Sequence, residues 1–129
     1  MILFAIGIND SRFFTISEMN QTPLTQFIEN IQTLINRARE HTNNIVILCL
    51  TNIDEFKTQP IPRRPELFYN NEQIQRYDQQ LQTICKQENI PFIPLQGVIE
   101  KEDLDNDGLH PNSQGHKKIA QQVREKISL

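Results

Sequence analysis

The sequence of 129 residues has no tryptophan, only two cysteines and no long apolar run. A membrane-spanning helix needs about 18 consecutive apolar residues, so the sequence predicts no membrane span. Cys49 and Cys85 fall within an expected strand and an expected helix, and we interpret them as small core side chains, not as a disulfide or metal pair. The sequence also lacks the excess of basic residues that favours nucleic-acid binding, because it has 13 basic and 16 acidic residues.

A secretory signal pattern is lacking as well. Residues 1–6 contain no basic side chain, and no small-residue cleavage site follows them. The fractions of apolar and charged residues, 37% and 22%, are ordinary for a globular protein. These observations predict a cytoplasmic protein with one domain over residues 1–129.

Three short apolar runs predict strands at residues 2–6, 45–50 and 90–95. Runs of this length are typical of strands that are buried on both faces of a parallel sheet. Between and after them, apolar residues recur at spacings of three and four, which predicts helices over 22–41, over 71–89 and in the last fifteen or so residues. The expected N-caps are Thr22, then Asn70 or Asn71, then Asn112 or Ser113. This alternating order predicts an α/β fold.

Ligands of open parallel sheets bind at the carboxyl ends of the strands, where two loops of this chain carry polar residues. One loop follows the first strand and contains Gly7, Asn9 and Asp10. An Asn amide in such a turn can donate to a developing oxyanion, although a G-x-N-D sequence alone is more often an Asx turn. The other loop, 96–111, ends in Asp107-Gly108-Leu109-His110-Pro111. An aspartate three residues before a histidine can hold one ring nitrogen and leave the other free to act as a general base.

Together and in this order, the two motifs resemble those of the SGNH/GDSL hydrolase family. Residues 4–11 resemble the block with the oxyanion-binding asparagine, and residues 107–112 the block with the triad aspartate and histidine. The resemblance implies a three-layer α/β/α, flavodoxin-like fold and hydrolysis of a small ester through a serine acyl-enzyme, without cofactor or metal. The site residues that it implies are Asp107 and His110 as the catalytic pair, Asn9 as the oxyanion donor, and Gly7 and Asp10 as supporting residues.

One part of the family pattern has no counterpart in the sequence. Members carry the nucleophilic serine in a G-D-S block and a second oxyanion donor, a glycine, in the next block, and both precede the block that begins here at Gly7. We therefore expect an N-terminally truncated domain, which has three of the family's five strands and three main helices. We also expect the chain alone to have little activity. Ser11, which follows Asp10, is an alternative nucleophile.

Two further hypotheses belong to other classes. Without the preceding strands, strand 2–6 has an open edge, which predicts an interaction module that pairs with a second copy or with a missing N-terminal fragment. Separately, Asp103-x-Asp105-x-Asp107-Gly108 matches the first half of an EF-hand calcium loop. The second half does not match, because the position of the bidentate glutamate is occupied by Gln114.

Overall fold

A computed structural model describes residues 1–127 of the chain, and a three-stranded parallel sheet lies at its centre. Its strands are β1 (Ile2–Phe4), β4 (Ile45–Leu48) and β6 (Phe92–Ile93), in the order β1-β4-β6. The predicted parallel strands are thus confirmed. Each is shorter than its apolar run, and β6 is flanked by Pro91 and Pro94, which have no N–H to donate.

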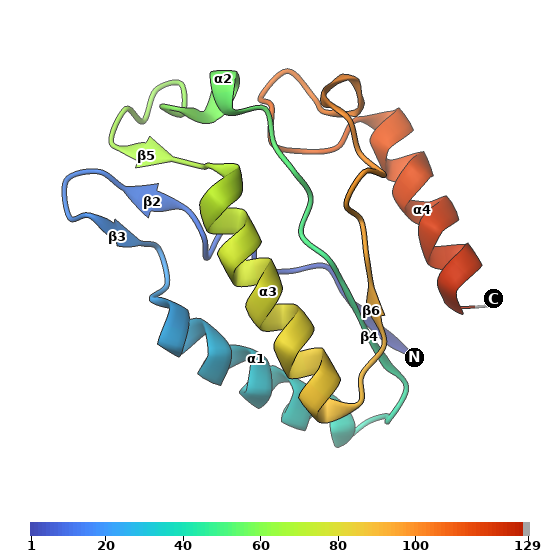
Figure 1. Ribbon diagram of the computed structural model, residues 1–129. Coiled ribbons are helices and arrows are strands. Elements are labelled where there is room, and N and C mark those ends of the chain that lie inside the picture. Colours follow the sequence, from blue (N-terminus) through green and yellow to red (C-terminus); the bar gives the residue numbers. More distant parts are fainter. Residues whose placement is uncertain (128–129) are drawn as a thin grey trace.

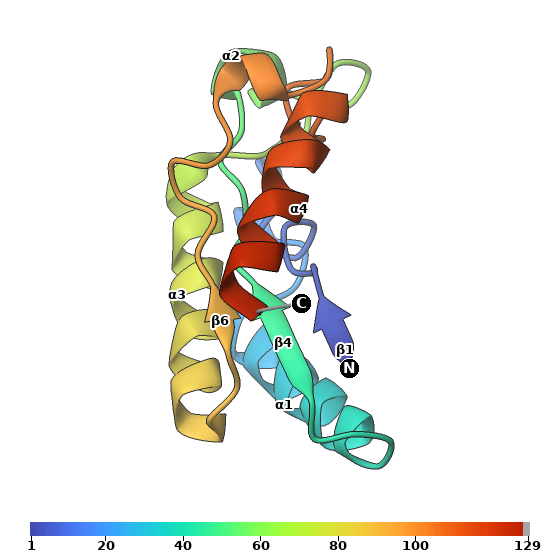
Figure 2. The same cartoon turned by 90° about the vertical axis from the view of Figure 1, so that its right-hand side faces the viewer.

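Helices cover both faces of this sheet (Figures 1 and 2). The helices α1 (Leu24–Arg39) and α3 (Asn71–Glu88) pack against each other and against Ile45 and Ile47 of β4. The last helix, α4 (Ser113–Ile127), packs against Val46 and Leu48. Because successive side chains of a strand point to opposite faces, α4 lies opposite α1 and α3. The expected three-layer α/β/α fold is confirmed.

The start of α1 differs from the prediction. The N-cap of this helix is Pro23 and no side chain caps it, so the prediction that Thr22 is the cap is wrong. Thr22 instead uses its backbone, whose N–H donates to the Asp10 carbonyl at 3.2 Å and whose carbonyl accepts the Tyr77 hydroxyl. These bonds tie the loop after β1 to α3.

The other two main helices begin at the predicted asparagines. The Asn70 side chain accepts the N–H of Gln73 at 2.7 Å at the start of α3. The Asn112 side chain accepts two backbone N–H groups of the first turn of α4, at 2.9 and 3.1 Å. Such caps satisfy backbone donors that have no partner inside the helix.

A second, smaller sheet was not predicted. It is antiparallel, in the order β3-β2-β5, and pairs Phe13 with Phe68, which brings the chain around residue 69 next to the loop after β1. Its strands are only two residues long, too short to produce a pattern in the sequence. These and the other short elements are β2 (Phe13–Phe14), β3 (Met19–Asn20), α2 (Glu55–Thr58), β5 (Leu67–Phe68) and a 3₁₀ turn, η1 (Lys101–Asp103).

Strand β1 is at the edge of the parallel sheet, as Figure 2 shows. Within the described residues it pairs on one side only, with β4. Leu3 in this strand is 40% exposed, and Met1 and Ile6 beside it are also exposed. An unpaired strand edge with apolar neighbours is able to accept another strand. No helix in residues 1–127 has the length and apolarity that crossing a membrane requires.

A buried carboxylate joins α3 to the ends of β4 and β6. Asp78 is 5% exposed and accepts the backbone N–H of Leu50 at 2.7 Å, the side-chain amide of Gln96 at 3.0 Å and the thiol of Cys49 at 3.1 Å. Burial, with a contribution from Asp78, raises the pKa of Cys49 to about 12, and burial likewise raises that of Cys85 to about 11. Both cysteines are free and buried, as predicted.

Candidate active site

The loop after β1 turns sharply at Gly7, which has a φ of +119°. A Cβ at this position would lie 3.2 Å from the ring of Phe27 and 3.4 Å from the side chain of Leu50. Glycine is therefore favoured both by its backbone angle and by the space available. Past this point the chain forms a turn in which the N–H of Asp10 donates to the Gly7 carbonyl at 3.1 Å. The turn places Asn9 at the carboxyl end of β1.

Asn9 is exposed, and its side-chain carbonyl is occupied. The Tyr69 hydroxyl donates to Oδ1 of Asn9 at 2.6 Å. Within residues 1–127 no hydrogen bond involves Nδ2 of Asn9, so both of its N–H donors remain free for a ligand. The sequence does not reveal this contact, because 60 residues separate the two side chains.

Ser11 lies in the same turn but is oriented inward. It is 1% exposed, and its hydroxyl donates to the Ile8 carbonyl at 2.7 Å. A buried hydroxyl that stabilises a turn is not available to attack a substrate carbonyl. This placement counts against Ser11 as a nucleophile.

Asp107 and His110 contact each other at the end of the second loop. Oδ2 of Asp107 lies 2.6 Å from Nδ1 of His110, while Oδ1 accepts the backbone N–H groups of Leu109 and His110 at 2.9 and 3.0 Å. The histidine side chain is 71% exposed and the aspartate side chain 50%. No hydrogen bond of the described part of the chain uses Nε2 of His110. The ring is therefore held on one nitrogen and open to solvent on the other, which is the arrangement of a general base.

The hydrogen bonds that Asp107 accepts change its acidity. Partial burial raises the pKa of this carboxyl, but the bonds from the His110 side chain and from two backbone N–H groups outweigh burial and lower the pKa to about 2 from an ordinary value of 3.8. A lowered pKa in the folded state stabilises the fold above the unfolded pKa. The contribution of this pair is therefore complete above about pH 4 and is lost as the pH falls through 2.

Gly108 fixes this loop against the chain that follows β4. Its φ is +70°, and its carbonyl accepts the N–H of Asp54 at 2.8 Å. A Cβ on Gly108 would lie 2.7 Å from Cβ of Lys57 and 3.1 Å from the Asp54 carbonyl. These atoms belong to the backbone or are next to it, so they cannot move aside cheaply.

Gly108→Ala is expected to lower the free energy of unfolding by about 3 kcal/mol, since a left-handed backbone angle costs about 1 kcal/mol and overpacking about 2 more. Gly97→Ala is the matched control, because Gly97 has a φ of +71° and no neighbour within 4 Å of its Cβ. The control is expected to lose about 1 kcal/mol. Urea denaturation measures both values, and equal losses would contradict the close packing at Gly108.

Two of the three carboxylates of the partial calcium motif are bound to other partners. Asp103 is 5% exposed, forms an ion pair with Lys118 at 2.5 Å and accepts the N–H of Glu100, and the Lys118 bond lowers its pKa. Asp107 holds His110. Within residues 1–127 no group of three potential metal ligands comes together. The geometry thus favours the histidine pair over a calcium loop.

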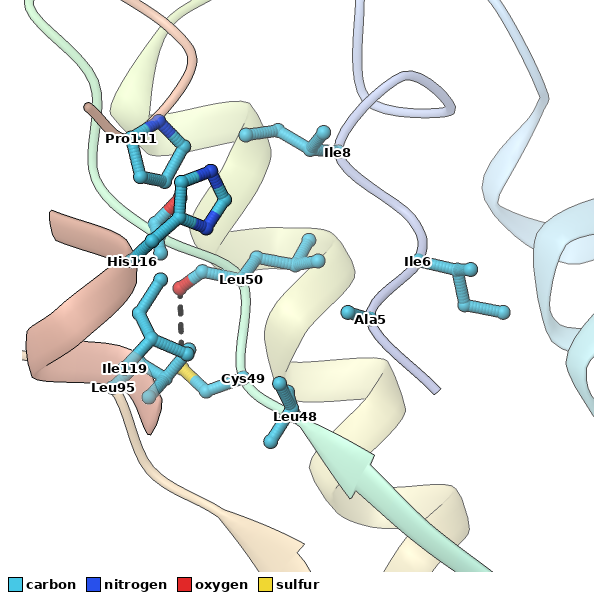
Figure 3. A pocket seen from close by; sticks show the side chains of 11 residues that line it. Ala5, Ile6, Ile8, Leu48, Cys49, Leu50, Leu95, Pro111, His116 and Ile119 are labelled. Carbon is cyan, nitrogen blue, oxygen red and sulfur yellow. Dashed lines mark hydrogen bonds between the residues drawn. The ribbon is translucent and has the colours of Figure 1, made fainter. Parts of the chain in front are cut away.

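A cavity of about 240 Å³ opens at the carboxyl ends of β1 and β4 (Figure 3). Ile8 and Pro111, which are the sequence neighbours of Asn9 and His110, both line it. His116 and Ile119 of α4 line another side of it, near Leu50 (Figure 3). The two loops that carry the predicted site residues therefore border one apolar cavity.

Comparisons with known proteins agree with this architecture. The family model described as "GDSL-like Lipase/Acylhydrolase family" matches residues 1–118. The chain is similar to the structure of a GDSL-like lipase from Bacteroides thetaiotaomicron VPI-5482, with a TM-score of 0.74 and 17% identity over 98% of this chain and 60% of that chain. It is similar to a lipase/acylhydrolase from Enterococcus faecalis, with a TM-score of 0.70 and 21% identity over 98% and 59%. No curated protein sequence matches.

A third similar structure is an acetylxylan esterase from Geobacillus stearothermophilus, with a TM-score of 0.68 and 18% identity over 96% of this chain and 57% of that chain. Two structures of that esterase are described as catalytic mutants, one with a serine and one with a histidine replaced by alanine. At these identities the likeness shows a shared fold. The chain spans at most 60% of the length of each of these structures.

Proposed function

This chain belongs to the GDSL-like lipase/acylhydrolase family, and from that membership we propose that it hydrolyses carboxylic esters with Asp107 and His110 as the acid–base pair and Asn9 as an oxyanion donor. The observation that carries the proposal is the 2.6 Å contact between Nδ1 of His110 and Oδ2 of Asp107, together with the free Nε2. A carboxylate on Nδ1 keeps the proton there, so Nε2 can take a proton from a nucleophile.

In the proposed mechanism, a nucleophilic hydroxyl attacks the ester carbonyl and its proton moves to Nε2 of His110. The developing negative charge on the carbonyl oxygen accepts an N–H of the Asn9 amide, a contact worth about 3 kcal/mol in comparable sites. His110 then donates its proton to the leaving alkoxide. Water attacks the acyl intermediate in the same way and releases the acid.

We propose that the nucleophile reaches His110 from outside the described residues. The serines at 11, 17 and 113 do not form a hydrogen bond with His110, and Ser128 lies outside the described residues. The free edge of β1 and the apolar cavity beside it form the surface on which the additional segment would pack. A segment that carries the G-D-S block is the favoured occupant, and a second copy of the chain is the alternative.

The test is hydrolysis of p-nitrophenyl acetate by the chain alone. Turnover is expected to be slow, and His110→Ala is expected to lower it about 100-fold, toward the rate in buffer, because a positioned general base contributes about that much. His41→Ala is the matched control, since His41 is an exposed residue just after α1 and does not line the cavity, and it is expected to retain the rate.

The possible results separate the two parts of the proposal. Fast turnover that His110→Ala abolishes would show that the chain contains its own nucleophile. Turnover that both histidine variants retain would instead contradict the role of His110.

A further inference from the structure

The Asn9 amide can act as an oxyanion donor only in one of its two orientations. Its carbonyl and its NH₂ group are chemically opposite, and a rotation by 180° exchanges the donor for an acceptor. A partner that donates to Oδ1 stabilises the orientation in which NH₂ points away from that partner. The Tyr69 hydroxyl donates to Oδ1 at 2.6 Å. A hydroxyl can also accept, but the Arg12 guanidinium beside the Tyr69 oxygen offers only donors and so directs the hydroxyl proton toward Oδ1.

Tyr69 is itself firmly held. The residue is 3% exposed and belongs to the main core cluster, and it follows β5 directly. Its backbone N–H donates to the Thr58 carbonyl at 3.1 Å, and its carbonyl accepts the Thr58 hydroxyl at 3.1 Å. The hydroxyl therefore reaches an exposed side chain from a rigid base in the core.

The surroundings keep the Tyr69 hydroxyl protonated. Burial raises the pKa of this phenol, and the Arg12 guanidinium nearby opposes burial only in part. A phenol with a raised pKa keeps its proton, and thus its ability to donate to Oδ1, throughout the neutral range.

We propose that Tyr69 is a positioning residue, whose hydroxyl holds the Asn9 amide with its NH₂ group directed toward the substrate oxygen. The inference rests on the proposed function, because it takes Asn9 to be the oxyanion donor. Tyr69 does not touch the substrate. It acts by removing the orientation of Asn9 that would present a carbonyl to a negative charge.

Tyr69→Phe tests this, because it removes the hydroxyl and leaves the ring in the core. In ¹H–¹⁵N spectra of the whole chain, the side-chain NH₂ signals of Asn9 are assigned by their loss in Asn9→Asp. Tyr69→Phe is expected to move this pair toward the position of a free asparagine. Tyr77→Phe is the matched control, since it removes the hydroxyl of a buried tyrosine whose bond goes to Thr22. It is expected to shift the Asn9 signals less than Tyr69→Phe does.

Hydrolysis of p-nitrophenyl acetate gives the second measurement. Tyr69→Phe is expected to lower the slow rate of hydrolysis about tenfold, because without the bond to Oδ1 the Asn9 amide can turn away from the orientation that donates to the oxyanion. In an Asn9→Ala background, Tyr69→Phe is expected to have no further effect on the rate. If Tyr69→Phe acted through a general loss of stability, it would lower the rate in that background as well. An Asn9 pair that stays in place in Tyr69→Phe overturns the proposal. If the Asn9 pair moves in Tyr69→Phe but Asn9→Ala keeps full activity, Tyr69 positions Asn9 and the proposed role of Asn9 as oxyanion donor is wrong instead.

Discussion

Asp107→Asn is expected to exchange the proton between the two ring nitrogens of His110. In the native chain the carboxylate accepts from Nδ1 at 2.6 Å, so the neutral ring carries its proton on Nδ1. An asparagine amide can donate to Nδ1, which then favours the proton on Nε2. A ring protonated on Nε2 has no free electron pair there to accept the proton of a nucleophile.

The tautomer is measured directly by long-range ¹H–¹⁵N correlation of the ring at pH 9, and this measurement does not depend on turnover. The rate of p-nitrophenyl acetate hydrolysis is expected to fall about 100-fold, as in His110→Ala, because the base is lost in both variants. Asp105→Asn is the matched control, since Asp105 is an exposed carboxylate two residues away and only its backbone takes part in the loop. A native ring already protonated on Nε2 would contradict the orienting role of Asp107.

Asp78→Ala is expected to lower the free energy of unfolding by about 3 kcal/mol, because it leaves two buried donors without this acceptor. The backbone N–H of Leu50 and the thiol of Cys49 supply these donors after β4, while the third donor, the Gln96 amide, is exposed and can turn to water. Asp78→Asn is expected to lose less, about 2 kcal/mol, since its carbonyl can still accept the Leu50 N–H while its NH₂ group faces the other donors.

Urea denaturation followed by circular dichroism measures these losses. Gln79→Ala is the matched control, because Gln79 is the exposed next residue of the same helix, and its effect is expected to be within about 0.5 kcal/mol. If Asp78→Ala unfolded at the same urea concentration as the control, the hydrogen bonds that Asp78 accepts would contribute nothing to stability.

Much of the fold could be predicted because its signals are local. The apolar runs at 2–6 and 45–50 and the repeats of three and four each report a single element, and parallel strands then follow from the order of the elements. The contact between Asp107 and His110 is also local, since three residues and a tight turn at Gly108 suffice to close it.

Other features depend on contacts between distant segments. Asn70 lies near Tyr69 in the sequence and could be recognised as a helix cap, but the contact of Tyr69 with Asn9 requires the small sheet, whose two-residue strands have no periodicity. The inward orientation of Ser11 could not be predicted either, because the sequence Asp10-Ser11 does not determine whether the hydroxyl faces solvent or the Ile8 carbonyl. Thr22 failed as a cap for the same reason, since its backbone serves partners in other elements.

Alkylation of the two buried cysteines can be used to measure local unfolding of the chain. Thiolates are the species that react with alkylating reagents, and both sulfurs are buried with pKa values of about 12 and 11. A reagent in the solvent can therefore reach Cys49 only when the packing between α4 and the end of β4 opens from the side of the cavity, and Cys85 only after α3 leaves the core. The order in which the two sulfurs are alkylated reports which side of the sheet opens first.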